Sequence, residues 1–207
     1  MNASVYLAAL GLSLSQFIAI GPQNAYVIKQ GIGRSYVVFI VVFCIVCDAI
    51  LISCGVFGAS EVVAQVPGLV KAIAWLGACF MFWLGYKSWR AVLASRHKGL
   101  EVTHSVERDL KSVLRTLIIV CFFNPYGLLE TMVLIGGVST VYGVAYQSSF
   151  LLGCITASAL WFVMLGILAS QLAPLFKKPI SWRILDGGVG CVMFAVGTML
   201  LYNVGFA

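Results

Sequence analysis

Charged residues are scarce in this sequence. Of its 207 residues, 13 are Lys or Arg and seven are Asp or Glu, so that charged residues make up 10% of the chain and hydrophobic residues 61%. The mean hydropathy is +1.03. Soluble domains typically carry about 25% charged residues. The composition therefore excludes a soluble domain and indicates an all-α integral membrane protein.

A basic leader is also missing. No Lys or Arg precedes the first apolar run, which begins near Ser4 and is longer than the apolar core of a secretory signal peptide. We therefore expect this run to be retained as a membrane span.

Patterns that would hold a metal are missing as well. The two histidines, His97 and His104, fall in a charged stretch that we interpret as a solvated linker. The seven cysteines lie in apolar runs, where cysteine behaves as a small hydrophobic residue. Cys44 and Cys47 form a C-x-x-C, but a zinc site needs four ligands at recognisable spacing. We predict no metal site and no cofactor.

Six apolar runs are long enough to be membrane spans, since a spanning helix needs about 20 residues. They cover residues 4–30, 37–60, 69–88, 113–139, 148–173 and 184–204. The connections after the first, third and fifth runs hold 12 of the 13 Lys and Arg. The positive-inside rule places these connections in the cytoplasm and both termini outside. The excess of basic residues thus predicts orientation, not nucleic-acid binding.

Two of the spans contain a proline that interrupts the helix. Pro22 in Gly21-Pro22-Gln23-Asn24 cannot donate a backbone hydrogen bond, and it disfavours helical dihedrals at the preceding residue. We expect the helix to restart with Pro22 as its first residue, near the bilayer midplane. Asn124-Pro125 interrupts the fourth span in the same way. Packed proline kinks, unrelated to each other, are the alternative interpretation.

The paired breaks indicate an internal repeat. We predict a first three-helix repeat over 1–94, a cytoplasmic linker over 95–111 and a second repeat over 112–207. The motif C-x-M-F-x-x-G occurs at Cys79 in the third span and again at Cys191 in the sixth. Because each half has three spans, the halves must be inverted relative to each other. Broken helices at corresponding places of inverted halves point to the binding site of a transporter.

Two acids are expected inside the membrane beside these breaks. Asp48 lies in the middle of the second span, and Glu130 follows Pro125 by five residues. A carboxylate at the bilayer centre costs about 2.5–3.5 kcal/mol on insertion scales and usually faces a cavity or a partner. We therefore assign both to a substrate or proton site, with a protonated structural role as the alternative for Asp48. For Asp186, at the edge of the last span, we expect a local ion pair with Arg183.

Two hydroxyls of the fifth span, Thr156 and Ser158, lie at a similar depth and are weaker candidates for the site. Helix N-termini suit a carboxylate, and buried acids suit a cation. A zwitterionic or basic amino acid combines both groups. The substrate-site candidates are Gly21, Pro22, Gln23, Asn24, Asp48, Asn124, Pro125 and Glu130.

The motif from Ile20 to Gly31, IGPQNAYVIKQG, closely resembles the first-span motif of the LysE/ArgO family of basic amino-acid exporters. The similarity continues through Cys47-Asp48, Trp75-Leu-Gly, Phe123-Asn-Pro, Ile135-Gly-Gly-Val and Ala157-Ser-Ala-Leu-Trp-Phe. Related homoserine and threonine exporters usually have Pro-Gly-Pro where this chain has Ile20-Gly21-Pro22.

The resemblance implies a bacterial inner-membrane exporter of lysine and arginine, not an enzyme, with its conserved acids at Asp48 and Glu130. The chain departs from the family in one motif. The family commonly has Asn-Pro-x-x-Tyr-Leu-Asp where this chain reads Asn124-Pro-Tyr-Gly-Leu-Leu-Glu130, which affects the choice of substrate more than transport itself.

Export of a cation from an inside-negative cell favours coupling to protons, with Asp48 or Glu130 as the proton carrier. Export of another amino acid or of a divalent metal, and thiol electron transfer, are the alternatives. Small residues such as Gly153 and Ala157 leave open whether helices pack within one chain or between two copies in a homo-oligomer.

Overall fold

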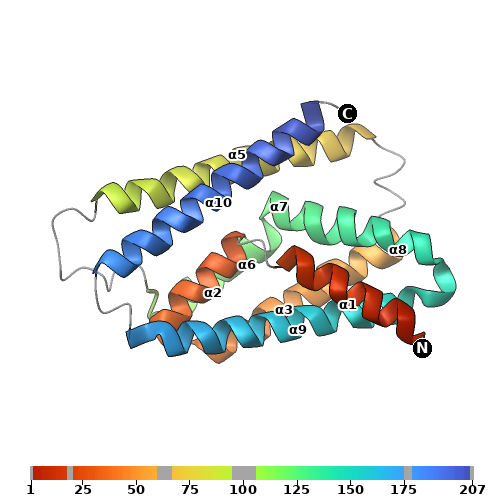
Figure 1. The fold of residues 1–207 in the computed structure, drawn as a ribbon, viewed down its shortest axis with the longest axis horizontal. Coiled ribbons are helices and arrows are strands. Elements are labelled where there is room, and N and C mark those ends of the chain that lie inside the picture. The colour runs from red at the N-terminus through yellow and green to blue at the C-terminus, as the bar shows by residue number, and fades with distance from the viewer. Residues whose placement is uncertain (1, 18–20, 60–66, 95–105, 175–178, 206–207) are drawn as a thin grey trace.

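The computed structural model describes residues 2–17, 21–59, 67–94, 106–174 and 179–205. Within these ranges every regular element is a helix (Figure 1). The elements are α1 (Ala3–Phe17), α2 (Pro22–Ile32), α3 (Val37–Cys54), η1 (Gly55–Ala59), α5 (Pro67–Ala94), α6 (Leu110–Phe122), α7 (Pro125–Leu128), η3 (Leu129–Ile135), α8 (Gly136–Tyr142), η4 (Val144–Tyr146), α9 (Gln147–Leu172) and α10 (Pro179–Gly205). Residues 95–105, which hold both histidines and most of the predicted linker, lie outside the described residues.

Several of these helices are suited to a membrane by length and hydropathy. In the described part of the chain, Val37–Gly58 and Val144–Leu172 each meet the requirement for a span alone. The pairs α1–α2 and α6–α8 meet it when each bent pair is taken as one span. The all-helical membrane architecture is therefore confirmed, with two to four candidate spans by this measure.

Both proline breaks occur where the sequence predicts them. The helix α2 begins with Pro22 as its first residue, and α1 and α2 are bent by 73° relative to each other. The second break lies between Phe122 and Pro125, where α6 ends and α7 begins with a bend of 46°. Proline at the first helical position costs no hydrogen bond, because that N–H has no partner within the helix.

The long helix α9 packs against α1, α2 and α3 (Figure 1). Gly153 allows α1 to approach closely, since a Cβ on this glycine would collide with the carbonyl oxygen of Tyr6 and lie 2.9 Å from the Cβ of Ala9. Ala157 belongs to the same buried cluster as Ala9. These two small residues of α9 therefore pack helices within one chain.

The helices α5 and α10 lie side by side and run antiparallel (Figure 1). Their repeated motifs contact each other reciprocally. A Cβ on Gly85 would lie 3.1 Å from the ring of Phe194, and one on Gly197 would lie 3.2 Å from the ring of Phe82. The two phenylalanine rings are 5.8 Å apart. Equivalent residues of the two motifs thus exchange equivalent contacts, as a local two-fold relation requires.

Candidate functional site

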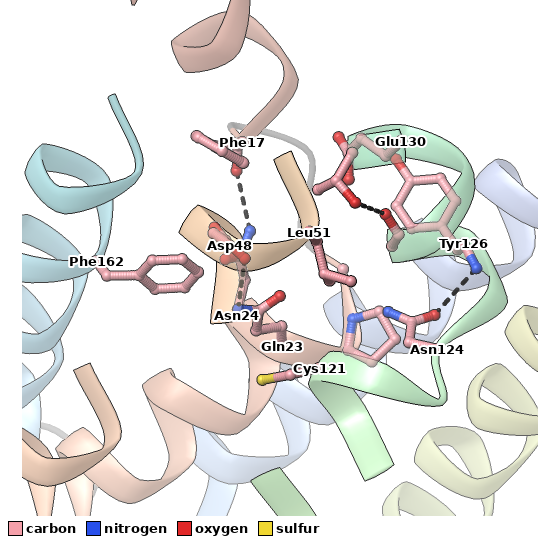
Figure 2. A pocket seen from close by; sticks show the side chains of 14 residues that line it. Phe17, Gln23, Asn24, Asp48, Leu51, Cys121, Asn124, Tyr126, Glu130 and Phe162 are labelled. Carbon is pink, nitrogen blue, oxygen red and sulfur yellow. Dashed lines mark hydrogen bonds between the residues drawn. The ribbon is translucent and has the colours of Figure 1, made fainter. Parts of the chain in front are cut away.

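A cavity lies where the two helix breaks meet (Figure 2). Its walls come from the start of α2, the middle of α3, the end of α6, the α7–η3 segment and α9. The lining residues are Phe17, Gly21, Pro22, Gln23, Asn24, Asp48, Leu51, Cys121, Asn124, Tyr126, Gly127, Glu130, Thr131 and Phe162. Segments far apart in the sequence thus place their polar groups around one space.

The start of α2 faces this cavity without a capping side chain. Gly21 occupies the N-cap position with an extended backbone, and in the described part of the chain it makes no side-chain capping hydrogen bond. Asn24 holds the break together instead: its Nδ2 donates to the carbonyl oxygen of Phe17 at 2.9 Å, and its Oδ1 accepts from Trp161 Nε1 at 3.1 Å. The N-terminal end of α2, with the partial positive charge of its helix dipole, therefore lies at the cavity.

Asp48 is the more enclosed of the two acids, with 3% of the residue exposed. Gln23 Nε2 donates to its Oδ1 at 3.2 Å, and Ser158 Oγ donates to its Oδ2 at 2.8 Å. Both donors are neutral, so they orient the carboxylate without cancelling its charge. Among the described residues no cation forms an ion pair with Asp48, and the two hydrogen bonds offset part of the cost of burying its charge.

Glu130 approaches the cavity from the other broken helix. The side chain of Asn124 caps the start of α7, because its Oδ1 accepts from the backbone N–H of Tyr126 at 3.2 Å. The helix then widens into the π-helical segment η3, with Glu130 in its first turn. Such π-helical turns inside α-helices are frequent at functional sites. Figure 2 shows Tyr126 of α7 and Glu130 of η3 across the cavity from Phe162.

The structure shows which of the candidate residues predicted from the sequence line the cavity. Seven of the eight main candidates line the cavity, and Pro125 does not. Ser158 does not line it either but holds Asp48 in place. Thr156 lies apart, and its hydroxyl donates to the carbonyl oxygen of Leu152 in its own helix.

Sequence reasoning missed other members of the cavity wall. The cavity wall also includes Tyr126, Gly127 and Thr131. Their position in the sequence, next to Asn124-Pro125 and Glu130, could have indicated that they belong to the site. The apolar members Phe17, Leu51 and Phe162 carry no such signal, because an apolar residue in a membrane span can face lipid, another helix or a cavity.

The cavity is small. Its volume is about 30 Å³, which admits water. Sites that enclose small organic ligands measure roughly 300–1,000 Å³. In this conformation the site is therefore closed, and a ligand of amino-acid size needs a movement of the surrounding helices.

The far end of α2 is tied to other segments. Lys29 forms an ion pair with Asp186 of α10 at 2.5 Å, so the expected local pair between Asp186 and Arg183 is wrong. The hydroxyl of Tyr26 donates to Glu107 Oε2 at 3.0 Å, and Thr116 Oγ1 donates to Glu107 Oε1 at 2.8 Å. The tertiary fold brings Lys29 to Asp186, whereas spacing along one helix suggested Arg183. The short helix α2 is thus held at both ends.

Comparison with known proteins identifies the family. A family model described as LysE type translocator matches residues 14–204. The arginine exporter protein ArgO of Escherichia coli (strain K12) is 34% identical over 197 residues, which cover 95% of this chain and 93% of that protein. The arginine exporter protein ArgO of Serratia proteamaculans (strain 568) is 32% identical over 200 residues, 97% of each chain. No solved structure matches. The chain therefore belongs to the LysE-type translocator family.

Proposed function

We propose that this protein exports basic amino acids, arginine foremost, from the bacterial cytoplasm through the inner membrane. The observation that carries the proposal is the meeting of Asp48, Glu130 and the uncapped start of α2 around one cavity. This set offers negative charge for a cationic side chain and the positive end of a helix dipole for a carboxylate. The arginine exporters named above favour arginine within that class.

The α-carboxylate of the substrate is assigned to the start of α2. The N-terminus of a helix carries a partial positive charge, which attracts anions. At α7 the corresponding place is occupied by the Asn124 side chain, whereas Gly21 leaves α2 open. The two breaks therefore differ, and α2 is the one suited to the carboxylate.

The cationic side chain is assigned to Asp48 and Glu130. Gln23 and Ser158 fix the orientation of the Asp48 carboxylate. Glu130 has no ion-pair partner among the described residues. A guanidinium has five donors in a planar fork and can bridge two carboxylates. Neutral amino acids lack this group, so the site selects against them.

Transport requires the closed cavity to open alternately to each side. We assign this movement to two inverted three-helix repeats within six membrane spans, with both termini on the periplasmic side. The reciprocal contacts of Phe82 with Gly197 and of Phe194 with Gly85 support the two-fold relation between the repeats. The distribution of Lys and Arg supports the orientation.

Coupling to protons completes the proposal. Moving one positive charge out against a potential of 100 mV costs about 2.3 kcal/mol. Entry of a proton in exchange for a cationic amino acid removes this cost, and Asp48 or Glu130 can hold the proton while the substrate is absent. In proteoliposomes, an inward proton gradient, with the outside more acidic than the inside, is expected to accelerate arginine efflux. An efflux rate that ignores the gradient contradicts the coupling but not export.

Export itself is tested in exporter-deficient cells loaded with arginine-containing or lysine-containing dipeptides. The protein is expected to speed the release of arginine. Loss of one charge-assisted hydrogen bond removes about 1.5–3 kcal/mol, so Asp48→Asn and Glu130→Gln should slow release roughly ten- to hundredfold. Asp109→Asn is the matched control: it removes a carboxylate from the exposed N-cap of α6, where asparagine caps equally well.

Two outcomes contradict different parts of this assignment. Export by Asp48→Asn at the unchanged rate, with equal protein in the membrane, overturns the site. If the unmodified protein moves neither arginine nor lysine, the substrate class is wrong, and neutral amino acids and divalent metals should be screened.

A further inference from the structure

A second, larger hollow lies on the outside of the helix bundle, between α3 and α9. Its volume is about 580 Å³, and none of its lining residues lines the cavity described above. The lining residues are Arg34, Val37, Val38, Val41, Val42, Ile45, Val163, Gly166, Ile167, Ser170 and Gln171. We call it the α3–α9 groove. Its polar residues gather at one end, and the rest of the wall is aliphatic.

The depth of the α3–α9 groove comes from a close approach of its two helices. Its floor is formed by Gly166 and Val41, both buried. A Cβ on Gly166 would lie 2.8 Å from Val41 Cγ2, so a larger residue would force the Val41 side chain to shift. The walls are exposed, with Val38 79% and Val42 53% accessible. A narrow aliphatic channel open to the outside therefore remains between α3 and α9.

The groove is no longer than one leaflet of a bilayer. Along α3 it runs from Val37 to Ile45, eight residue steps or about 12 Å of helix, and Arg34 lies beyond this stretch in the preceding loop. The hydrocarbon core of a bilayer is about 30 Å thick, so one leaflet is about 15 Å. A groove within one leaflet suits an acyl chain better than a helix of a second copy, which would cross the full thickness.

The polar end of the groove carries a positive charge. Arg34 lies in the loop between α2 and α3, and its guanidinium donates to the carbonyl oxygen of Ser170 at 3.4 Å. Among the described residues no carboxylate forms an ion pair with it. Both Arg34 and Tyr36 have a φ of 51°, a backbone conformation that side chains other than glycine rarely adopt. Such strain is found where a local structure serves to position a group.

We propose that the α3–α9 groove binds a phospholipid whose headgroup carries a net negative charge. One acyl chain lies along the aliphatic channel, and the headgroup phosphate lies at Arg34 beside Ser170 and Gln171. Basic pockets between transmembrane helices bind anionic headgroups in this way. The combination of one cationic end and a channel that stays within one leaflet favours an amphiphile over a protein segment.

The test measures lipid retained by the purified full-length protein. The protein is incubated in micelles containing phosphatidylglycerol or phosphatidylcholine with identical acyl chains and is then transferred to lipid-free micelles. The lipid that remains bound is counted by native mass spectrometry. One basic residue near a membrane surface should favour phosphatidylglycerol roughly fivefold. Arg34→Gln should abolish this preference, and Arg34→Lys should keep it.

A second pair of variants tests the channel. Val42→Trp places a bulky ring in the groove and should remove the retained lipid. Val46→Trp is the matched control, since Val46 is 51% exposed on the same helix but does not line the groove. Equal retention of both lipids by the unmodified protein, or equal loss of lipid from both tryptophan variants, overturns the proposal. A dimer that Val42→Trp converts to a monomer would identify the groove as an interface between copies and would also overturn it.

Discussion

The ion pair between Lys29 and Asp186 offers a direct test of how α2 is held. It joins the short helix that begins at the site to α10, across 157 positions of the sequence. The two side chains retain 24% and 12% of their accessible surface, so the pair is largely but not fully buried. We expect it to stabilise the closed conformation by fixing the far end of α2.

Its strength can be bracketed from the burial. Exposed ion pairs contribute about 0.2–1 kcal/mol, whereas removing one partner of a fully buried pair costs about 3–5 kcal/mol. Because both side chains keep some contact with solvent, we expect a coupling energy of about 1–2 kcal/mol. Leaving the Asp186 carboxylate unpaired should destabilise the protein more than leaving Lys29 unpaired, since Asp186 is the less exposed partner.

The measurement is a double-mutant cycle with Lys29→Met and Asp186→Asn. The free energy of unfolding is taken from denaturant titrations in micelles for the unmodified protein, both single variants and the double variant. The loss of unfolding free energy in Lys29→Met should exceed half of the loss in the double variant, because Lys29→Met leaves the Asp186 carboxylate unpaired. Lys111→Met serves as the control, since Lys111 is exposed and such changes stay within about 0.5 kcal/mol. A coupling energy under about 0.3 kcal/mol refutes the view that this pair holds α2.

Two further predictions concern packing and the first helix break. Gly153→Ala should destabilise the protein by about 1–3 kcal/mol, because its Cβ would overlap α1. Gly11→Ala is the control, because a Cβ at Gly11 meets nothing within 4 Å, and it should be neutral or stabilise by up to about 1 kcal/mol in the same unfolding assay. Equal effects of the two changes would contradict the close packing of α9 on α1 at Gly153. Asn24→Ala should cost about 1–3 kcal/mol and reduce arginine efflux, because it leaves the Phe17 carbonyl and the Trp161 indole without their partner. Unchanged stability and efflux would show that Asn24 does not hold the break.

Several features of this protein were determined by the sequence alone. The membrane class follows from the scarcity of charge, and the two helix restarts follow from Pro22 and Pro125, because proline constrains its own backbone and that of the residue before it. The family follows from the motif around Gly21-Pro22. These properties are local, so no knowledge of the packing was needed to derive them.

The composition of the site was decided by the tertiary structure. Thr156 and Ser158 are two residues apart on one helix and therefore point to different faces. The packing of α9 turned Ser158 towards Asp48 and left Thr156 with its own backbone. In the same way Asp186 pairs with Lys29 of α2 instead of Arg183. Sequence spacing shows which residues share a helix face, but only the packing of helices shows what that face meets.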